Sequence, residues 1–389
     1  MKKKKNNQIP LYNIKLSSNA INEVKDSLKT GWLSPGPKVT SFEKAICSLM
    51  QTRYGALVSS ATAGLQLALT AVGVRPGKEV ITTPFTFVAT VEAIIAAGAK
   101  PVFADIDPHS LNIDPIGVSS KITNQTAAVM PLDLGGLPAN YDMLRDICKV
   151  NLLYLIGDSA HSIGSLYKNK PVSKYSDAAV ISFHATKNLI CGEGGIVLSR
   201  HKKLIDRVRT LSQHGMTANA YQRKSAQKWE YDVINPGFKA NMSEIHAAIG
   251  LGQLSVFDRE QKKRRALAKR YLKNLADFSE HLETPIEEKY IQHGWHLFII
   301  KLHFPRLKIN RNSFIKRMSE YGIECGVHYK PVFELSYYKK ALKLSSSSFP
   351  NAHNAWQRVV TLPLYPTLTF AQVDYISECI EKIVKKYSL

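Results

Sequence analysis

The strongest constraint on the fold is an alternation of short apolar segments with helical stretches over the first 250 residues. Strands that are buried on both faces read as continuous apolar runs, and strands separated by helices usually pair in parallel. The alternation therefore predicts an α/β fold with a mostly parallel sheet and helices on both faces. The expected strands are Glu79 to Thr83, Pro101 to Ile106, Ala127 to Leu132, Leu152 to Asp158, Ala178 to Phe183 and Gly195 to Ser199.

The remaining third of the chain has a different pattern. One long helix is expected from Ser243 to about Leu275, followed by a smaller α+β region. That region contains the segment Trp295 to Leu302, a helix near Arg311 to Tyr321, a strand from Ile323 to Tyr329 and a last helix from Phe370 to Lys386. A chain of 389 residues with 44% hydrophobic residues is long enough for about two domains. We predict a large domain with an N-terminal arm over residues 1–250 and a small C-terminal domain over residues 251–389.

Lys187 lies on an expected turn after the apolar strand that ends at Phe183, and Gly192 to Gly195 follow shortly after it. A lysine that binds an aldehyde covalently must be held in place, partly desolvated and able to lose its proton, and such settings occur where a short loop leaves a buried strand. A solvated loop lysine is the alternative, because the chain has 52 Lys and Arg residues and most of them must lie on the surface.

Asp158 is expected at the carboxyl end of a buried strand, where open α/β sheets bind ligands. In enzymes that use pyridoxal 5′-phosphate (PLP), an aspartate keeps the pyridine nitrogen protonated so that the ring can withdraw electrons from a carbanion. An aspartate that caps the following turn explains the same position. His161 could lie against a cofactor or bond to Asp158, but a packed histidine is the more common case.

Two further segments suit a phosphorylated aromatic cofactor. Small and hydroxyl residues begin the helical pattern at Ala61 and Thr62, where free backbone N–H groups could bind a phosphate, and Ser182 could add a second hydroxyl. Ordinary N-capping explains these residues equally well. Phe87 is expected near the start of another helix, where it could stack on a pyridine ring or pack in the core.

Together these motifs resemble the DegT and StrS group of sugar aminotransferases. The resemblance rests on Ser60 to Ala63, Phe87, Asp158 to His161, Ser182, Lys187, Gly192 to Gly195, His214-Gly215, Gly237 to Asn241 and His328-Tyr329, in that order and spacing. It extends over nearly the whole chain, roughly from Ile9 to Ile383. It implies the type I fold of aspartate aminotransferase, PLP as cofactor, a homodimer, and transfer of an amino group from glutamate to a keto-sugar nucleotide.

The resemblance also implies a role for each site residue. Lys187 would bind PLP covalently, and Asp158 would pair with the pyridine nitrogen. Phe87 and His161 would contact the ring, while Ala61, Thr62 and Ser182 would hold the phosphate, which Asn241 would reach from the neighbouring subunit. The sugar nucleotide would contact His328, Lys239 and Arg223, and no metal ion is expected.

Within the group, the sequence most resembles the aminotransferases that make UDP-4-amino-4-deoxy-L-arabinose. Shared segments include Gly31 to Lys38, Ser59 to Gly64, Ser182 to Ala185, Pro236 to Asn241 and Trp295 to Ile300. Departures occur at Ala240, Phe87 and Gly157 to Ser159, near the expected cofactor and dimer contacts. The resemblance therefore favours C4 of a UDP-4-keto pentose, used in cell-surface polysaccharide or lipopolysaccharide synthesis, over other 4-keto or 3-keto sugars.

Two other functions are weighed against this one. Related sugar dehydratases carry histidine at the lysine position, so Lys187 argues against that chemistry. A non-catalytic regulatory protein with the same fold would not need Lys187, Asp158 and Asn241 together.

The net charge of +21 raises the question of nucleic-acid binding. The charges are scattered, however, and lack the interleaved aromatic residues of single-strand binders, so we expect no specific nucleic-acid partner. Five cysteines without metal-ligand spacing suggest reduced thiols in the cytoplasm. The longest apolar region, Phe87 to Ala104, is interrupted by Glu92 and Lys100, so we also expect no membrane span.

Overall fold

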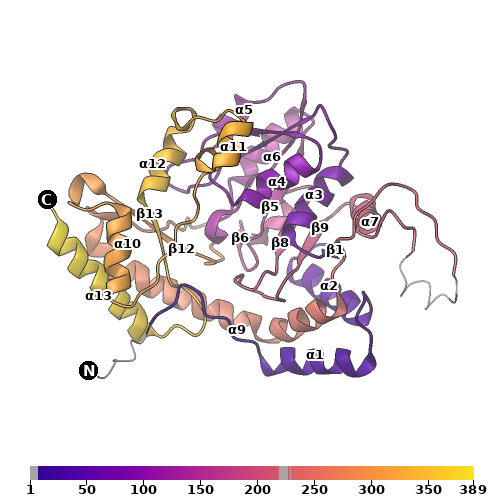
Figure 1. Ribbon diagram of the computed structural model, residues 1–389, viewed down its shortest axis with the longest axis horizontal. Coiled ribbons are helices and arrows are strands. Elements are labelled where there is room, and N and C mark those ends of the chain that lie inside the picture. Colours follow the sequence, from indigo (N-terminus) through magenta and orange to yellow (C-terminus); the bar gives the residue numbers. More distant parts are fainter. Residues whose placement is uncertain (1–7, 219–226, 228) are drawn as a thin grey trace.

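The computed structural model describes residues 8–218, 227 and 229–389, and its centre is a seven-stranded sheet in the order β1-β9-β8-β5-β4-β2-β3 (Figure 1). Strands β8, β5, β4, β2 and β3 are parallel, whereas β9 is antiparallel to both β1 and β8. The mostly parallel sheet is therefore confirmed. The strands are β1 (Tyr54–Val58), β2 (Glu79–Thr82), β3 (Lys100–Phe103), β4 (Thr126–Val129), β5 (Tyr154–Asp158), β8 (Ala178–Ser182) and β9 (Gly195–Ser199).

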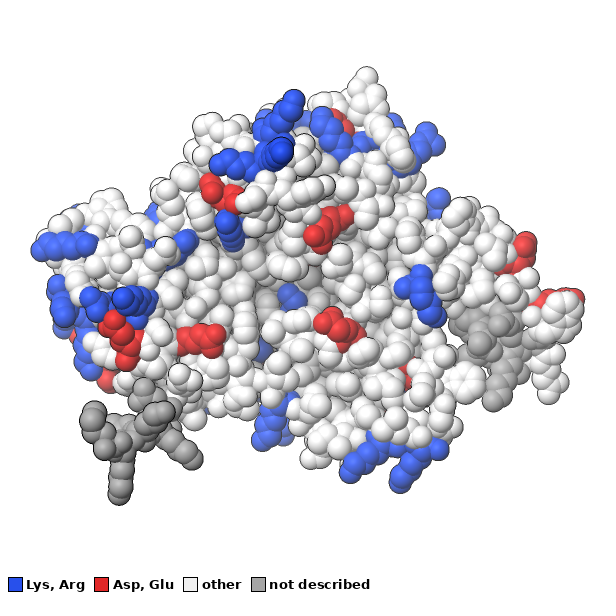
Figure 2. Space-filling view, in the orientation of Figure 1, with Lys and Arg blue, Asp and Glu red and all other residues white. Residues whose placement is uncertain are grey.

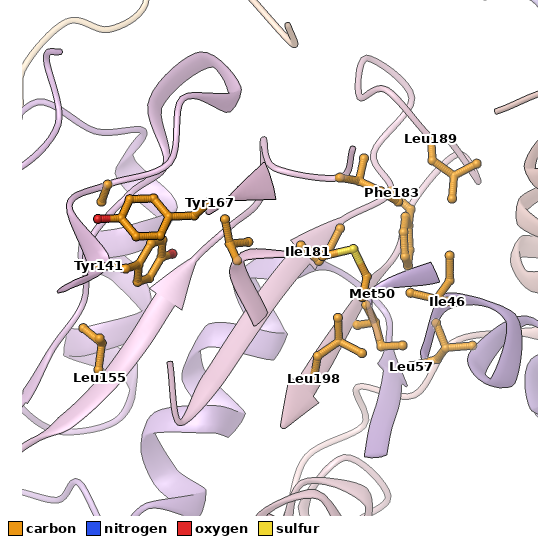
Figure 3. Close-up of a cluster of buried hydrophobic side chains, with 14 of the residues drawn as sticks. Ile46, Met50, Leu57, Tyr141, Leu155, Tyr167, Ile181, Phe183, Leu189 and Leu198 are labelled. Carbon is orange, nitrogen blue, oxygen red and sulfur yellow. The ribbon is translucent and has the colours of Figure 1, made fainter. Parts of the chain in front are cut away.

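Both faces of this sheet are covered by helices, as the continuous apolar strands predict. Successive side chains of a strand point to opposite faces, so Leu155 packs in one core and Ile156 in the other. The Leu155 face, shown in Figure 3 with Tyr141, Phe183 and Ile46 among its labelled residues, is covered by α2 (Pro37–Leu49), α5 (Pro115–Ser119), α6 (Tyr141–Val150) and the start of α9 (Glu244–Asn274). The Ile156 face is covered by α3 (Ala61–Ala71), α4 (Val88–Ala96) and α7 (Lys202–Leu211).

A further core is built mainly from the C-terminal third of the chain. It lies around the antiparallel sheet of β10 (Leu282–Glu283), β12 (Phe298–Leu302) and β13 (Val359–Leu362), with α10 (Arg311–Glu320) and α13 (Phe370–Tyr387) packed against it. A fourth apolar cluster joins α11 (Ser336–Ala341) and α12 (Pro350–Arg358) to the loops at the edge of the main sheet. In a small third sheet, β6 (Leu166–Tyr167) lies between β11 (Ile291–Gln292) and β7 (Lys170–Pro171) and pairs with both.

Helix α9 links the cores. Ser243 caps its start by accepting a hydrogen bond from the backbone N–H of His246. Its first half contributes Ala247 and Phe257 to the sheet core, and its second half contributes Leu267 and Tyr271 to the C-terminal core. Figure 1 shows α9 running beneath both parts, with α1 (Ser18–Thr30) alongside it. The domain boundary at residue 250 falls inside this helix and stays a prediction.

One predicted element is wrong, and several strands were missed. Residues Ile323 to Tyr329 do not form a strand, because Ile323 pairs with Ile9 whereas Gly326 pairs with Thr361. The segment thus divides its backbone bonds between two different partners and forms no continuous ladder. The strands that pair with β12 are β10 and β13, and the sequence interpretation predicted neither of them, nor β1 of the central sheet.

The positive charge is spread over the surface. On the face in Figure 2, Lys and Arg side chains gather in separate groups over α10 and α13, near α11 and over α1. All five cysteines are unpaired. Within the described residues, no helix is long and apolar enough to cross a membrane.

Candidate active site

The loops at the carboxyl ends of β5 and β8 surround a cavity of about 290 Å³. Its lining includes Lys187, Asp158, His161, Ser182, Ala61, Thr62, Phe87 and His328, together with Tyr12, His184, Glu193, His296 and Tyr329. The structure therefore brings together residues that are far apart in the sequence, such as Tyr12 and His328, which are 316 positions apart. Eight of the eleven predicted site residues line this one cavity.

Lys187 occupies the turn that follows β8, where its backbone N–H bonds to the carbonyl of His184 at 2.9 Å. Burial lowers the pKa of the Lys187 ammonium to about 8, and the nearby Asp158 carboxylate opposes that shift. A substantial fraction of this lysine can therefore be the neutral amine near physiological pH, which is the form that attacks a carbonyl.

Asp158 is the last residue of β5 and is almost fully buried. Its Oδ2 accepts a hydrogen bond from the Thr90 hydroxyl at 2.7 Å, and its Oδ1 accepts one from the backbone N–H of Ala160 at 3.3 Å. Because the single Thr90 proton points to Asp158, the Thr86 hydroxyl at 2.6 Å donates to Thr90. Burial raises the pKa of Asp158, while the Thr90 hydrogen bond and Lys187 counteract it.

His161 is held as a neutral ring rather than bonded to Asp158. The backbone N–H of Gly135 donates to its Nδ1 at 3.2 Å, so the ring proton lies on Nε2 and points to the Tyr329 hydroxyl at 3.1 Å. The ring also lies 4.5 Å from that of His296, measured between centroids. Burial lowers the pKa of His161 well below its usual range. The arrangement presents an uncharged aromatic surface to the cavity.

An exposed aromatic ring and a helix N-terminus complete the part of the cavity nearest the sheet. Phe87 precedes the first residue of α4 and remains 55% exposed, with its ring 5.8 Å from that of Tyr329. Helix α3 begins at Ala61, and its capping residue Ser60 accepts from the N–H of Ala63, which leaves earlier N–H groups available. A Cβ added to Gly195 would lie 2.8 Å from the Ala61 nitrogen, so this glycine allows β9 and the helix start to approach closely.

These features fit PLP. The flat apolar ring face suits the pyridine ring, and the buried carboxylate suits its nitrogen. The lysine with a lowered pKa suits the aldehyde, and the free helix N-terminus suits the phosphate. In the residues that the structure describes, no cluster of His, Cys, Asp or Glu could hold a metal ion.

His328 also lines this cavity. Its Nε2 is 2.8 Å from the hydroxyl of Tyr12, and its Nδ1 is 2.8 Å from that of Thr361. Burial lowers the pKa of His328 to about 4, so the ring is neutral at physiological pH. Tyr12 comes from the N-terminal arm, which is anchored where the backbone of Ile9 pairs with Ile323.

Three predicted site residues do not line this cavity. Asn241 lines a separate cavity of about 470 Å³ between α2 and α7, and its Oδ1 is buried without a hydrogen-bond partner among the described residues. Lys239 is exposed and pairs with Gln213 through a backbone bridge. Arg223 lies outside the described residues.

The sequence interpretation missed Tyr12, Thr90 and His296 as site residues. Thr90 has no special sequence context, since it is one of several small residues in the first turn of α4. Tyr12 reaches the cavity only because the arm docks on the C-terminal core. His296 belongs to the Trp295 to Ile300 segment that carried part of the resemblance, and this was the available signal.

A strand-end carboxylate facing a lysine with a lowered pKa, on a mostly parallel α/β sheet, defines a PLP-dependent enzyme of the type I fold. A model of the DegT/DnrJ/EryC1/StrS aminotransferase family matches residues 15–381. The chain belongs to this family, and it is a PLP-dependent sugar aminotransferase.

Individual relatives cover nearly the full chain. The spore coat polysaccharide biosynthesis protein SpsC of Bacillus subtilis (strain 168) is 39% identical over 387 residues, which are 99% of each chain. Spr1654 of Streptococcus pneumoniae, solved in its PMP form, is 31% identical with a TM-score of 0.91, over 97% of this chain and 99% of that one. Its PLP form has a TM-score of 0.90. PseC of Helicobacter pylori, an aminotransferase involved in the biosynthesis of pseudoaminic acid, is 26% identical with a TM-score of 0.90, over 98% and 100% of the two chains.

Proposed function

We propose that this enzyme transfers the amino group of glutamate to C4 of a UDP-4-keto sugar, with a UDP-4-keto pentose as the favoured substrate. The observation that carries the transfer chemistry is the single cavity that joins Lys187, Asp158 and the start of α3. The choice of sugar is supported by the resemblance of Gly31 to Lys38 and Trp295 to Ile300 to the enzymes of 4-amino-4-deoxy-L-arabinose synthesis. The name of SpsC supports a role in the synthesis of a cell-surface polysaccharide, such as that of lipopolysaccharide.

Each residue at the cofactor has a proposed role that follows from its surroundings. Lys187 would bind PLP covalently, Asp158 would bond to the pyridine nitrogen, and the helix start at Ala61 and Thr62 would bind the phosphate with help from Ser182. Phe87 and His161 contact the ring, which their exposed and uncharged surfaces suit. When bound, PLP supplies an electron sink that stabilises negative charge at a substrate carbon.

Lys187 also moves the reacting proton. With the cofactor and an amino donor bound, the free amine of Lys187 would accept the proton from the donor α-carbon and would later give it back. A pKa of about 8 suits this task, because a base works best when its pKa is near the operating pH. Asp158 keeps the pyridine proton in place during this transfer, and Thr90 keeps Asp158 oriented by a 2.7 Å hydrogen bond.

We propose that the active site is shared between two subunits of a homodimer in the cytoplasm. Asn241 reaches the phosphate in the partner's site, and His328, Lys239 and Arg223 bind the sugar nucleotide. Support comes from Asn241, which lines a cavity separate from that of Lys187 and whose buried Oδ1 has no hydrogen-bond partner among the described residues. Five unpaired cysteines suit a reducing compartment.

Mixing two inactive variants tests the shared site. Heterodimers of Lys187→Ala and Asn241→Ala subunits should recover part of the activity, because one of the two hybrid sites regains both residues. Verified heterodimers without activity would reject the shared arrangement.

A substrate panel tests the reaction itself. The purified holoenzyme is incubated with glutamate and a set of 4-keto and 3-keto nucleotide sugars, and amino-sugar formation is measured. We expect the highest kcat/KM for a UDP-4-keto pentose. A strong preference for a 3-keto sugar would reject the positional assignment, and PLP binding without any turnover would favour a regulatory protein.

A further inference from the structure

A second, smaller cavity adjoins the active site at Lys187. It measures about 40 Å³ and lies between the N-terminal arm, α9 and the loop after β13. Tyr12, Thr186 and Lys187 line both cavities, so these three side chains separate them. We call the smaller one the arm cavity, and its other lining residues include Lys15, Asn188, Gln253, Glu260 and Arg264.

The two cavities differ in charge. Among the described residues that line the larger cavity, Lys187 is the only lysine or arginine, while Asp158 and Glu193 are acidic. The arm cavity adds Lys15 and Arg264 and contains one carboxylate, Glu260. An acidic amino donor that reacts at Lys187 therefore finds its complementary charge in the arm cavity.

Arg264 is the buried member of this pair, with 5% of its surface exposed. Its Nη1 donates to the carbonyl of Leu364 at 2.8 Å, but its Nε has no hydrogen-bond partner among the described residues. Burial lowers the pKa of Arg264 to about 10, which still leaves the guanidinium charged at neutral pH. A buried charged donor without an acceptor is costly, and a carboxylate would relieve that cost.

The size of the arm cavity also discriminates between ligands. A volume of about 40 Å³ holds roughly three water-sized groups. That space suits a small group such as a carboxylate. The donor's amino end would remain beside Lys187 in the larger cavity, because the two cavities meet there.

We propose that Arg264 binds the side-chain carboxylate of the amino donor, which makes the arm cavity the donor subsite and selects acidic over neutral amino acids. This inference rests on the proposed function only for its use of an amino-acid donor that reacts at Lys187. Glu260 limits the affinity, because its carboxylate competes for the same guanidinium.

Arg265 provides a matched control. It is the next residue of α9, its Nη2 donates to the carbonyl of Gly164 at 3.0 Å, and its Nε is likewise unpartnered among the described residues. It lines neither of the two cavities. A purely structural role for Arg264 through Leu364 would therefore give Arg264→Gln and Arg265→Gln similar effects.

The test compares donors in the first half-reaction of the holoenzyme. Rates of the absorbance change on adding glutamate or alanine are measured for the wild type, Arg264→Gln and Arg265→Gln, together with the Kd of glutarate, a dicarboxylate without an amino group. We expect Arg264→Gln to lower the preference for glutamate over alanine and to weaken glutarate binding, each by about 10- to 100-fold. Arg265→Gln should change neither measurement.

The outcomes separate the two claims. A wild-type enzyme that reacts with neutral amino acids but not with glutamate rejects glutamate as the donor and the subsite together. Normal reaction of the wild type, with Arg264→Gln indistinguishable from Arg265→Gln, overturns the role of Arg264 alone. If Arg264→Gln does not fold, Glu260→Gln decides: tighter glutarate binding is expected, and unchanged binding overturns the proposal.

Discussion

Two buried aspartates at adjacent strand ends serve different purposes. Asp158 ends β5, and Asp133 follows β4 on the neighbouring strand, with its backbone N–H donating to the Asp158 carbonyl at 3.2 Å. Asp158 faces the active-site cavity and Lys187, whereas Asp133 lines neither of the cavities around that lysine. The same residue type at the same edge of the sheet is therefore open to a ligand at Asp158 and stabilises the fold at Asp133.

The difference lies in how each carboxylate is satisfied. Asp133 accepts hydrogen bonds from the Ala139 N–H at 2.9 Å, the Tyr141 hydroxyl at 3.0 Å and the Ser162 hydroxyl at 2.7 Å. Burial raises the pKa of Asp133 to about 6 despite these donors. Asp158 receives fewer internal donors and has a cation nearby, so acceptor capacity remains for a ligand. A buried acid whose donors are all internal therefore indicates structure, and one left open beside a cation indicates function.

The largest effect on turnover is expected at Lys187, the cation that lies near Asp158. Lys187→Ala should abolish turnover and leave the melting temperature within a few degrees of the wild type, because only the covalent attachment and the proton transfer are lost. Borohydride treatment of the wild-type holoenzyme should place the pyridoxyl group on Lys187 in a peptide map. An adduct on any other lysine would remove Lys187 from its role.

Asp158→Asn should retain PLP but lower kcat by several orders of magnitude. A neutral amide cannot hold the pyridine proton, and each tenfold loss corresponds to about 1.4 kcal/mol of transition-state stabilisation. The measurement is single-turnover kinetics with glutamate, with PLP content determined by absorbance. A rate near that of the wild type would contradict the assignment and would make the two aspartates alike.

Asp133→Asn is the same change at the other aspartate, and it should lower stability and leave activity largely intact. Loss of one acceptor from a buried network should cost about 1–3 kcal/mol of unfolding free energy, with kcat within about tenfold of the wild type. Denaturant unfolding and steady-state kinetics measure both. A loss of activity as large as that of Asp158→Asn, at unchanged stability, would break the comparison.

The pH dependence of stability sharpens this result. Because the pKa of Asp133 is about 6 when folded and lower when unfolded, the folded state binds more protons between about pH 4 and 6. The contribution of Asp133 to the unfolding free energy therefore falls as the pH rises through this window. The difference in stability between wild type and Asp133→Asn should change across it in that direction, and a constant difference would contradict the shifted pKa.

The smallest effect is expected at Thr90. Thr90→Val keeps the shape and removes the hydrogen bond to Asp158, which should raise the pKa of Asp158 further and lower kcat by about tenfold. Thr70→Val is a control on α3, because the Thr70 hydroxyl bonds only to the local carbonyl of Gln66 among the described residues. Equal rates for both variants would show that Thr90 does not orient Asp158.

The sequence predicts the central sheet well for a physical reason. Strands buried on both faces must be apolar throughout, so the segments that form β5 and β8 can be recognised in the sequence. Asp158 ends the first and Lys187 lies on the turn after the second, so both candidates can be located from these strands. The error at Ile323 to Tyr329 arises because an apolar run does not reveal how many partners its backbone has.

What could not be predicted depends on contacts between distant segments. Tyr12 lies beside His328 only in the folded chain, and Arg264 is one of several basic residues in the second half of α9 that nothing in the sequence marks as buried. Asp133 belongs to no recognisable sequence motif, so the three groups that donate hydrogen bonds to it can be identified only from the structure. Sequence thus locates local chemistry, and the fold decides which residues support it.

The N-terminal arm has a consequence for how the protein is made. Ile9 and Leu11 leave the ribosome early, yet their partners Gly322, Ile323 and Glu324 are synthesised more than 300 residues later. The sheet, whose strands lie within residues 54–199, can form during synthesis, but the wall that Tyr12 provides must wait for the C-terminal core. A nascent chain can therefore assemble its lysine and aspartate long before it possesses a closed site, because the arm, although it is translated ahead of the sheet, docks only after the C-terminal core has formed.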